Sequence, residues 1–106
     1  MDNICKLLNH VEDNKDIWLI YEVCKGKTMN DELFNVKGEF YQGERVYRVH
    51  HSLFYHSIRN NHKLMTDFLR RMAEVFNLFE KAGVVHADMK PDNIIIDYDE
   101  QNQEIK

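Results

Sequence analysis

The sequence has little of what marks the unusual protein classes. Its 106 residues include one proline and four glycines, which excludes a collagen-like or low-complexity chain and indicates an ordinary globular one. Its two cysteines, Cys5 and Cys24, do not form a Cys-x-x-Cys pair. We therefore expect neither a disulfide framework nor a zinc ribbon, and predict two reduced thiols.

Long apolar runs and an excess of basic charge are also missing. The longest apolar runs, such as Ile17 to Tyr21, are far shorter than the ~20 residues of a transmembrane helix. The first six residues lack the basic and apolar regions of a signal peptide. Lys and Arg total 14 against 18 Asp and Glu, so the net charge is −4, with no basic block. We expect a cytoplasmic or nuclear protein with no membrane segment and no nucleic-acid partner.

The first part of the chain is patterned for strands and turns. A β-branched and aromatic run at Ile17 to Val23 predicts a buried strand. Residues Ile4 to Val11 fit either a partner strand, with a loop at Glu12 to Asp16, or a short helix. Residues 30–35 predict a short helix near an asparagine cap. Phe40 to Tyr47, around a glycine, predicts a small hairpin or a glycine-hinged loop.

The most regular periodicity lies between Lys63 and Ala82. Apolar residues recur there at steps of three and four, which predicts an amphipathic helix. Asp67 and Arg71 form an i,i+4 pair on its polar face. Gly83 is placed to end the helix with a left-handed cap. We interpret the Met and Phe stripe as core.

The segment after this helix carries the most chemistry. It contains a short apolar step, a polar loop with the single proline, and a β-branched run that ends at Asp97. Asp88, Lys90 and Asn93 would bring a carboxylate, an ammonium and an amide oxygen into one small space. Phosphoryl transfer needs this set, because it requires an acceptor for a hydroxyl proton, a cation against the phosphate charge and an oxygen ligand for Mg²⁺.

The pattern His86-x-Asp88-x-Lys90-Pro91-x-Asn93 resembles the catalytic loop of eukaryotic protein kinases. Three neighbouring features agree with this resemblance: the amphipathic helix that ends in glycine, the isoleucine-rich run after the loop, and the upstream apolar strand. That strand resembles the last strand of the kinase small lobe as it enters the hinge. The Lys two residues after the Asp favours the serine/threonine type.

The resemblance implies a partial protein-kinase-like fold of the α+β class. It would comprise the end of the small-lobe sheet, the hinge, the first large-lobe helices and the catalytic loop. Residues 1–24 would be the end of the small lobe and the hinge, and residues 25–62 a short helix and an insertion. Residues 63–106 would be a large-lobe helix, the catalytic loop and the following strand. Aromatic residues in the insertion, at 36–62, favour a docking surface or packing against the large lobe.

Roles carry over from the family to individual residues of the loop. The resemblance implies that Asp88 is the catalytic base, that Lys90 contacts the γ-phosphate and that Asn93 binds one Mg²⁺. ATP and Mg²⁺ are then the cofactors, and a protein is the substrate. Ala87 stands where many kinases have Arg, the residue that holds a phosphorylated activation loop. We expect His86 to hydrogen-bond and pack within the loop.

The same resemblance implies an adenine pocket. Tyr21 would be the gatekeeper, and the Glu22 carbonyl and the Cys24 backbone would hydrogen-bond adenine. Ile95 would lie beneath the adenine ring as the floor of the pocket.

Several kinase motifs are missing from these 106 residues. No Gly-x-Gly-x-x-Gly loop or Val-Ala-Ile-Lys strand precedes the hinge, and no Asp-Phe-Gly follows Asp97. We interpret the chain as a fragment of an ATP-dependent serine/threonine kinase, and expect no phosphoryl transfer from the isolated chain. The alternatives are a non-catalytic kinase-like (pseudokinase) binding module and a small-molecule phosphotransferase, the latter disfavoured by Lys90-Pro91. Much of the hydrophobic content would then be half of a core.

Overall fold

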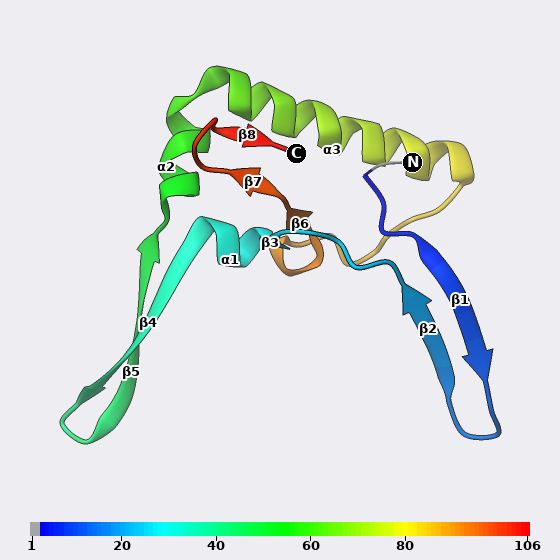
Figure 1. Cartoon of the computed structure of the whole chain (residues 1–106), viewed down its shortest axis with the longest axis horizontal. Coiled ribbons are helices and arrows are strands. Elements are labelled where there is room, and N and C mark those ends of the chain that lie inside the picture. The colour runs from blue at the N-terminus through cyan, green and yellow to red at the C-terminus, as the bar shows by residue number, and fades with distance from the viewer. Residues whose placement is uncertain (1–2) are drawn as a thin grey trace.

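The computed structural model describes residues 3–106, so the first two residues of the predicted segment 1–24 lie outside the described residues. Two long hairpins extend from a body in which the longest helix runs along one side (Figure 1). The described residues form four two-stranded antiparallel sheets, paired β1 with β2, β3 with β6, β4 with β5, and β7 with β8. None of their helices combines the length and the apolar character of a membrane span.

The first hairpin consists of β1 (Leu7–Glu12) and β2 (Ile17–Tyr21). Its turn is built on Asp13, whose carboxylate accepts the N–H groups of Lys15 and Asp16 at 2.8 and 2.7 Å. The strand interpretation of the first segment is therefore confirmed and its helix alternative is wrong. The predicted burial of β2 is also wrong: all five residues are exposed, with Trp18 at 60%. A two-stranded ribbon covers neither of its own faces, so burial requires a further element.

The predicted short helix is α1 (Met29–Leu33), which follows the two-residue strand β3 (Lys27–Thr28). The expected asparagine cap is wrong. Thr28 caps the helix, because its hydroxyl accepts the N–H of Asp31 at 3.2 Å while Asn30 already lies inside the first turn.

The second hairpin is longer than predicted. It consists of β4 (Phe34–Tyr41) and β5 (Glu44–His51), eight residues each, and the predicted segment covers only its tip. Gln42 and Gly43 form the turn with φ of 50° and 81°, as two-residue hairpin turns require. Phe40, at this tip, is 81% exposed. Packing of this aromatic residue against the body is therefore not observed.

The predicted long helix is confirmed as α3 (His62–Ala82), one residue longer at its start. Asn61 caps it, and Gly83 ends it in the predicted left-handed conformation with φ of 68°. A second helix, α2 (Leu53–Asn60), was not predicted, although Ser52 provides an N-cap signal.

A small core joins α2 and α3 to the last part of the chain. That part contains the 3₁₀ turn η1 (Pro91–Asn93), β6 (Ile95–Ile96), β7 (Tyr98–Asp99) and β8 (Glu104–Ile105). The buried apolar residues are Phe54, Ile58, Leu64 and Ile96.

The apolar stripe of α3 is buried only in part. Leu64, at the start of the helix, is buried, whereas Leu69 is 56% exposed and Phe76 is also exposed. The interpretation of the stripe as core is therefore correct at one end of α3 and wrong further along it, because the described elements cover only that end.

This exposure predicts the solution behaviour of the 106-residue chain. Heating is expected to give a broad loss of helical circular dichroism without a cooperative transition, and the dye ANS is expected to bind at room temperature, because exposed apolar side chains far outnumber buried ones. A sharp sigmoidal transition together with no ANS binding would show that the core seen at α2, α3 and β6 suffices for a native state.

Candidate active site

The loop between α3 and β6 is held at both ends. At its start, the N–H of Val84 donates to the carbonyl of Phe79 at 2.9 Å. At its end, β6 pairs with β3, and the N–H of Met29 donates to the carbonyl of Ile94 at 2.6 Å. Both ends of the loop are thus anchored by backbone hydrogen bonds.

Three polar side chains of this loop meet, as the sequence predicts. Lys90 Nζ lies 3.6 Å from Asp88 Oδ1, and Asn93 Nδ2 donates to Asp88 Oδ2 at 3.1 Å and to its carbonyl at 2.9 Å. The turn η1 makes this possible, since it brings the N–H of Asn93 to within 3.0 Å of the Lys90 carbonyl. We call Asp88, Lys90 and Asn93 the loop triplet. All three are exposed, so a substrate can reach them.

The residues just before the triplet shape the loop. The N–H of Asp88 donates to His86 Nδ1 at 3.1 Å, and the His86 ring lies 5.9 Å from the ring of Phe79. This is the hydrogen bonding and packing that the sequence predicts for His86. Ala87, between them, has φ of 67°, an uncommon conformation for a residue with a side chain. The backbone therefore turns sharply immediately before Asp88.

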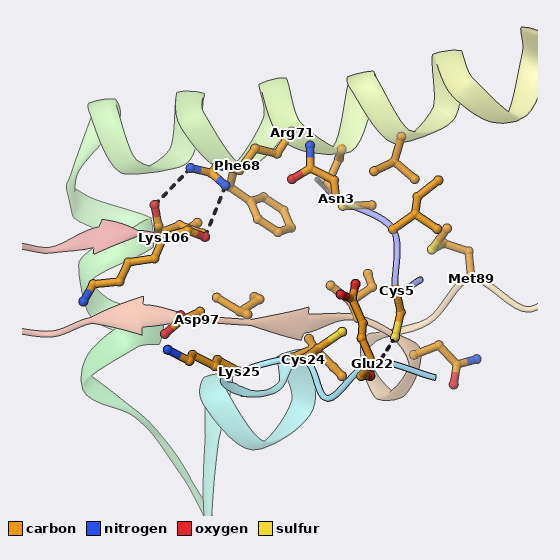
Figure 2. Close-up of a pocket in the computed structure, with 18 of the residues that line it drawn as sticks. Asn3, Cys5, Glu22, Cys24, Lys25, Phe68, Arg71, Met89, Asp97 and Lys106 are labelled. Carbon is orange, nitrogen blue, oxygen red and sulfur yellow. Dashed lines mark hydrogen bonds between the residues drawn. The ribbon is translucent and has the colours of Figure 1, made fainter. Parts of the chain in front are cut away.

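A cavity of about 660 Å³ lies between α3, β6, and the segments on either side of the first hairpin (Figure 2). Its size falls in the range of roughly 300 to 1,000 Å³ that is usual for small-molecule sites. Glu22, Cys24 and Ile95, the predicted adenine contacts, all line it, as does Asn93 from the loop triplet. The other two members of the triplet are not among the lining residues. Much of the wall is apolar and includes Phe68, Met72, Val75, Phe79, Ile94 and Ile96.

Comparison with known proteins decides the family. The model of the protein kinase domain matches residues 1–106, the whole chain. The chain belongs to the protein kinase family. Its mixture of helices and strands agrees with the predicted α+β class.

Several curated kinases resemble this kinase chain. Sperm motility kinase 2B of Mus musculus is 29% identical over 101 residues, which cover 92% of this chain and 16% of that protein. Calcium-dependent protein kinase 10 of Arabidopsis thaliana is 26% identical over 104 residues, which cover 98% of this chain and 15% of that protein. Aurora kinase of Schizosaccharomyces pombe is 29% identical over 97 residues, covering 92% and 21%. The chain thus spans between 15% and 21% of the length of these relatives. No solved structure matches it significantly.

Two polar residues of this kinase chain line the cavity although the sequence did not single them out for it. Arg71, assigned to the polar face of α3, lies 3.1 Å from Asp67 and donates to the carbonyls of Ile105 and Lys106 at 3.0 and 3.3 Å (Figure 2). It thereby ties the helix to β8. Asp97 also lines the cavity. The sequence signal that could have identified Asp97 as a cavity residue is its position directly after the β-branched run.

Charged neighbours lower the pKa of Asp67 on α3. Hydrogen bonds from Arg70 and Arg71 hold the pKa of the Asp67 carboxyl below its usual range. Asp67 therefore stays ionised near neutral pH, and the position of Arg71 at the cavity wall is maintained.

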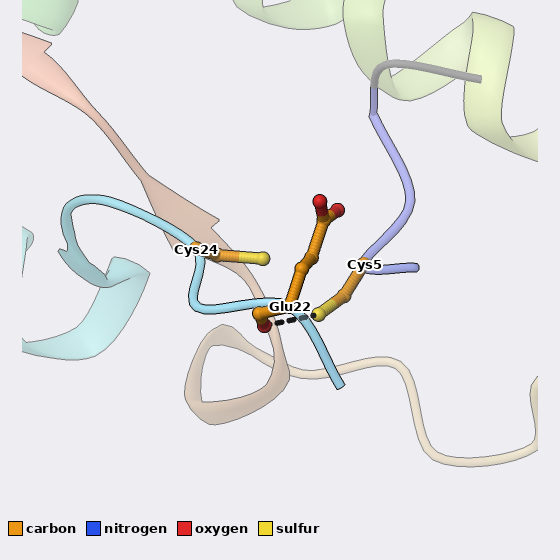
Figure 3. A group of neighbouring side chains, drawn as sticks. All are labelled: Cys5, Glu22 and Cys24. Carbon is orange, nitrogen blue, oxygen red and sulfur yellow. Dashed lines mark hydrogen bonds between the residues drawn. The ribbon is translucent and has the colours of Figure 1, made fainter. Parts of the chain in front are cut away.

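Cys5, Glu22 and Cys24 also line the cavity and lie close to one another (Figure 3). Cys5 Sγ donates to the Glu22 carbonyl at 3.4 Å, and the N–H of Lys6 donates to Glu22 Oε1 at 2.9 Å. Hydrogen bonding with Cys24, together with partial desolvation and the nearby Cys24 and Glu22 charges, raises the pKa of the Cys5 thiol to about 11. No disulfide joins Cys5 and Cys24 in this structure, and their reduced state stays a prediction.

Proposed function

We propose that the protein carrying this chain is an ATP-dependent protein serine/threonine kinase, which transfers the γ-phosphate of ATP to a protein hydroxyl. One observation carries the proposal: the loop triplet assembles beside a cavity that the predicted adenine contacts line. Membership in the protein kinase family supports it. The serine/threonine preference rests on Lys90, two residues after Asp88 in a loop that resembles serine/threonine kinases.

The proposal divides the chain by function. Residues 1–24 would be the end of the small lobe and the hinge, and residues 63–106 the large-lobe helix, the catalytic loop and the following strand. Residues 25–62 would contain a short helix and the insertion, which includes the exposed hairpin β4–β5. The position of the cavity supports this division, because residues of the first and last segments form its whole wall except for Lys25.

The triplet would divide the work of phosphoryl transfer. Asp88 would accept the proton of the substrate hydroxyl, and its ion pair with Lys90 keeps an ammonium beside the point where phosphate charge develops. The Asn93 amide nitrogen faces Asp88, so the amide oxygen is the atom available for a cation. Amide and carboxylate oxygens are the hard ligands that Mg²⁺ prefers. When bound, Mg²⁺ neutralises phosphate charge.

The adenine ring would occupy the cavity beside the hinge. The Glu22 carbonyl, which accepts from Cys5 Sγ in this structure, would accept from the base, and the backbone of Cys24 would provide a second contact. Ile95 is 49% exposed and lines the cavity, so its side chain offers apolar surface to a bound ring.

The decisive experiment measures transfer from γ-labelled ATP to a mixture of proteins by the complete purified protein. We expect label on serine and threonine, lost when EDTA removes Mg²⁺. Label on small molecules alone would contradict the proposal. Nucleotide binding without transfer would favour the second candidate, a non-catalytic kinase-like binding module. The exposed aromatic residues at the tip of β4–β5 favour this candidate.

The residue before Asp88 predicts how the activity is controlled. Ala87 has no guanidinium to pair with a phosphorylated activation loop. We therefore expect treatment of the complete protein with a phosphatase to leave its kinase activity unchanged, as measured by initial rates before and after treatment. A complete loss of activity would show that another cation takes the role.

A further inference from the structure

Three potential metal ligands converge at the base of the first hairpin. Cys5 precedes β1, and Glu22 and Cys24 follow β2. One ligand atom from each, the two sulfurs and a carboxylate oxygen, lie within 4.8 Å of one another. Figure 3 shows the Cys24 sulfur, the Glu22 carboxylate and the Cys5 sulfur around one small space.

The hairpin itself creates this cluster. Its ladder continues past β1 and β2, because the N–H of Glu22 donates to the Lys6 carbonyl at 2.9 Å and the N–H of Lys6 donates to Glu22 Oε1 at the same distance. The Cys5 thiol then meets the Glu22 carbonyl at 3.4 Å. Backbone pairing, rather than chance side-chain positions, therefore holds the segment of Cys5 against that of Glu22 and Cys24.

We propose that Cys5, Glu22 and Cys24 form a Zn²⁺ site that clips together the two chain segments at the base of the hairpin. In a tetrahedral zinc site, with bonds of about 2.3 Å to sulfur and about 2.0 to 2.2 Å to oxygen, neighbouring ligand atoms lie roughly 3.5 to 3.8 Å apart. The observed cluster needs only small side-chain movements to reach this geometry, and its exposure gives the ion and a fourth, water ligand access.

The chemistry of the ligands selects the ion. Two thiolates are soft donors, which favour Zn²⁺ over Mg²⁺ and Ca²⁺, and a single carboxylate completes a set of three protein ligands. The site shares no ligand with the proposed Mg²⁺ site, although Asn93 lines the same cavity, and the amide oxygen of Asn93 is a hard donor. The inference goes beyond the proposed kinase activity and does not depend on phosphoryl transfer.

Metal titration of the complete protein tests the site. The protein is reduced, freed of metal and titrated with Co²⁺, which is then displaced by Zn²⁺. We expect one equivalent of Co²⁺ to give a thiolate-to-cobalt absorption band attributable to this pair. Cys5→Ser and Cys24→Ser should each weaken binding by about 100-fold or more, and Glu22→Gln by about 10-fold. Folding of each variant is checked by circular dichroism.

The control variant replaces histidines outside the cluster. His50→Gln combined with His51→Gln, both in β5, should leave the Co²⁺ affinity unchanged. An unchanged affinity in the two cysteine variants, or no thiolate band at all, would overturn the proposal.

A second measurement uses the unaltered protein and so does not depend on any variant folding. Bound Zn²⁺ should slow the alkylation of both Cys5 and Cys24 by iodoacetamide, followed by peptide mass spectrometry. Equal alkylation rates with and without Zn²⁺ would overturn the site. The site would also be overturned if Cys5 and Cys24 are found joined by a disulfide and the protein binds no metal after that disulfide is reduced.

Discussion

Replacing Asp88 with Asn is expected to lower kcat for phosphoryl transfer by the complete protein about 10² to 10⁴-fold, the usual contribution of a general base. Asparagine matches aspartate in shape and can still meet Asn93 and the backbone of the loop, so the loop should keep its conformation. It cannot accept the proton of the substrate hydroxyl or pair with the Lys90 ammonium. The KM for ATP should change little, because the proposed adenine contacts lie on other segments.

Asp92 provides the matched control for this substitution. It lies four residues further on, in η1, and is exposed without belonging to the loop triplet. Asp92→Asn removes the same charge from the same loop and should keep the rate near that of the parent protein. Equal losses in both variants would mean that net charge, and not the position of Asp88, controls transfer. A fully active Asp88→Asn protein would remove the proposed base.

Gly26→Ala is expected to be the most disruptive change outside the loop. Gly26 has φ of 112°, and a Cβ placed on it would lie 2.2 Å from the carbonyl oxygen of Ile96 and 2.9 Å from the Cα of Asp97. Both obstacles are backbone, so the pairing of β3 with β6 must shift. We expect a loss of about 3 kcal/mol or more in the stability of the complete protein, at the upper end for overpacking. Nucleotide affinity should fall with it, since β6 forms part of the cavity wall.

Gly83→Ala is the control that distinguishes the steric clash expected in Gly26→Ala from the cost of a positive φ alone. Gly83 also has a positive φ, 68°, yet nothing lies within 4 Å of the added Cβ. This variant should cost only the left-handed penalty, about 1 kcal/mol. Thermal unfolding and protease resistance of both variants compare the two effects. If the Gly26 variant is no less stable than the Gly83 variant, the approach of Gly26 to Ile96 does not constrain the fold.

Features set by neighbouring residues were predictable from the sequence. The periodicity of α3 and its glycine cap needed only local geometry. The loop triplet also lies within six residues, so one 3₁₀ turn suffices to assemble it. Its expected proximity was therefore correct, while its catalytic roles stay predictions.

Features set by distant contacts were not predictable in the same way. The β-branched composition of β2 favours a strand, but its burial depends on elements that must cover it. The periodicity of α3 does not predict which element packs beside Arg71. In the structure, Arg71 contacts β8. Cys5 and Cys24 lie on opposite sides of a hairpin, so only its strand register brings their sulfurs together. The helix α2 was missed although Ser52 caps it and its residues are amphipathic; its buried residues Phe54 and Ile58 form part of the core together with residues of α3 and β6.

The ladder between β3 and β6 also governs how the fold can form. Among the described residues, the other three sheets join strands that are neighbours in the chain, whereas this ladder closes a loop spanning nearly two-thirds of it. Loop-closure entropy makes such a contact late and slow relative to local hairpins. We therefore expect β3 and β6 to meet after the local hairpins have formed. A nucleotide that binds the cavity beside β6 only after this ladder has closed would slow its reopening and so stabilise the closed chain.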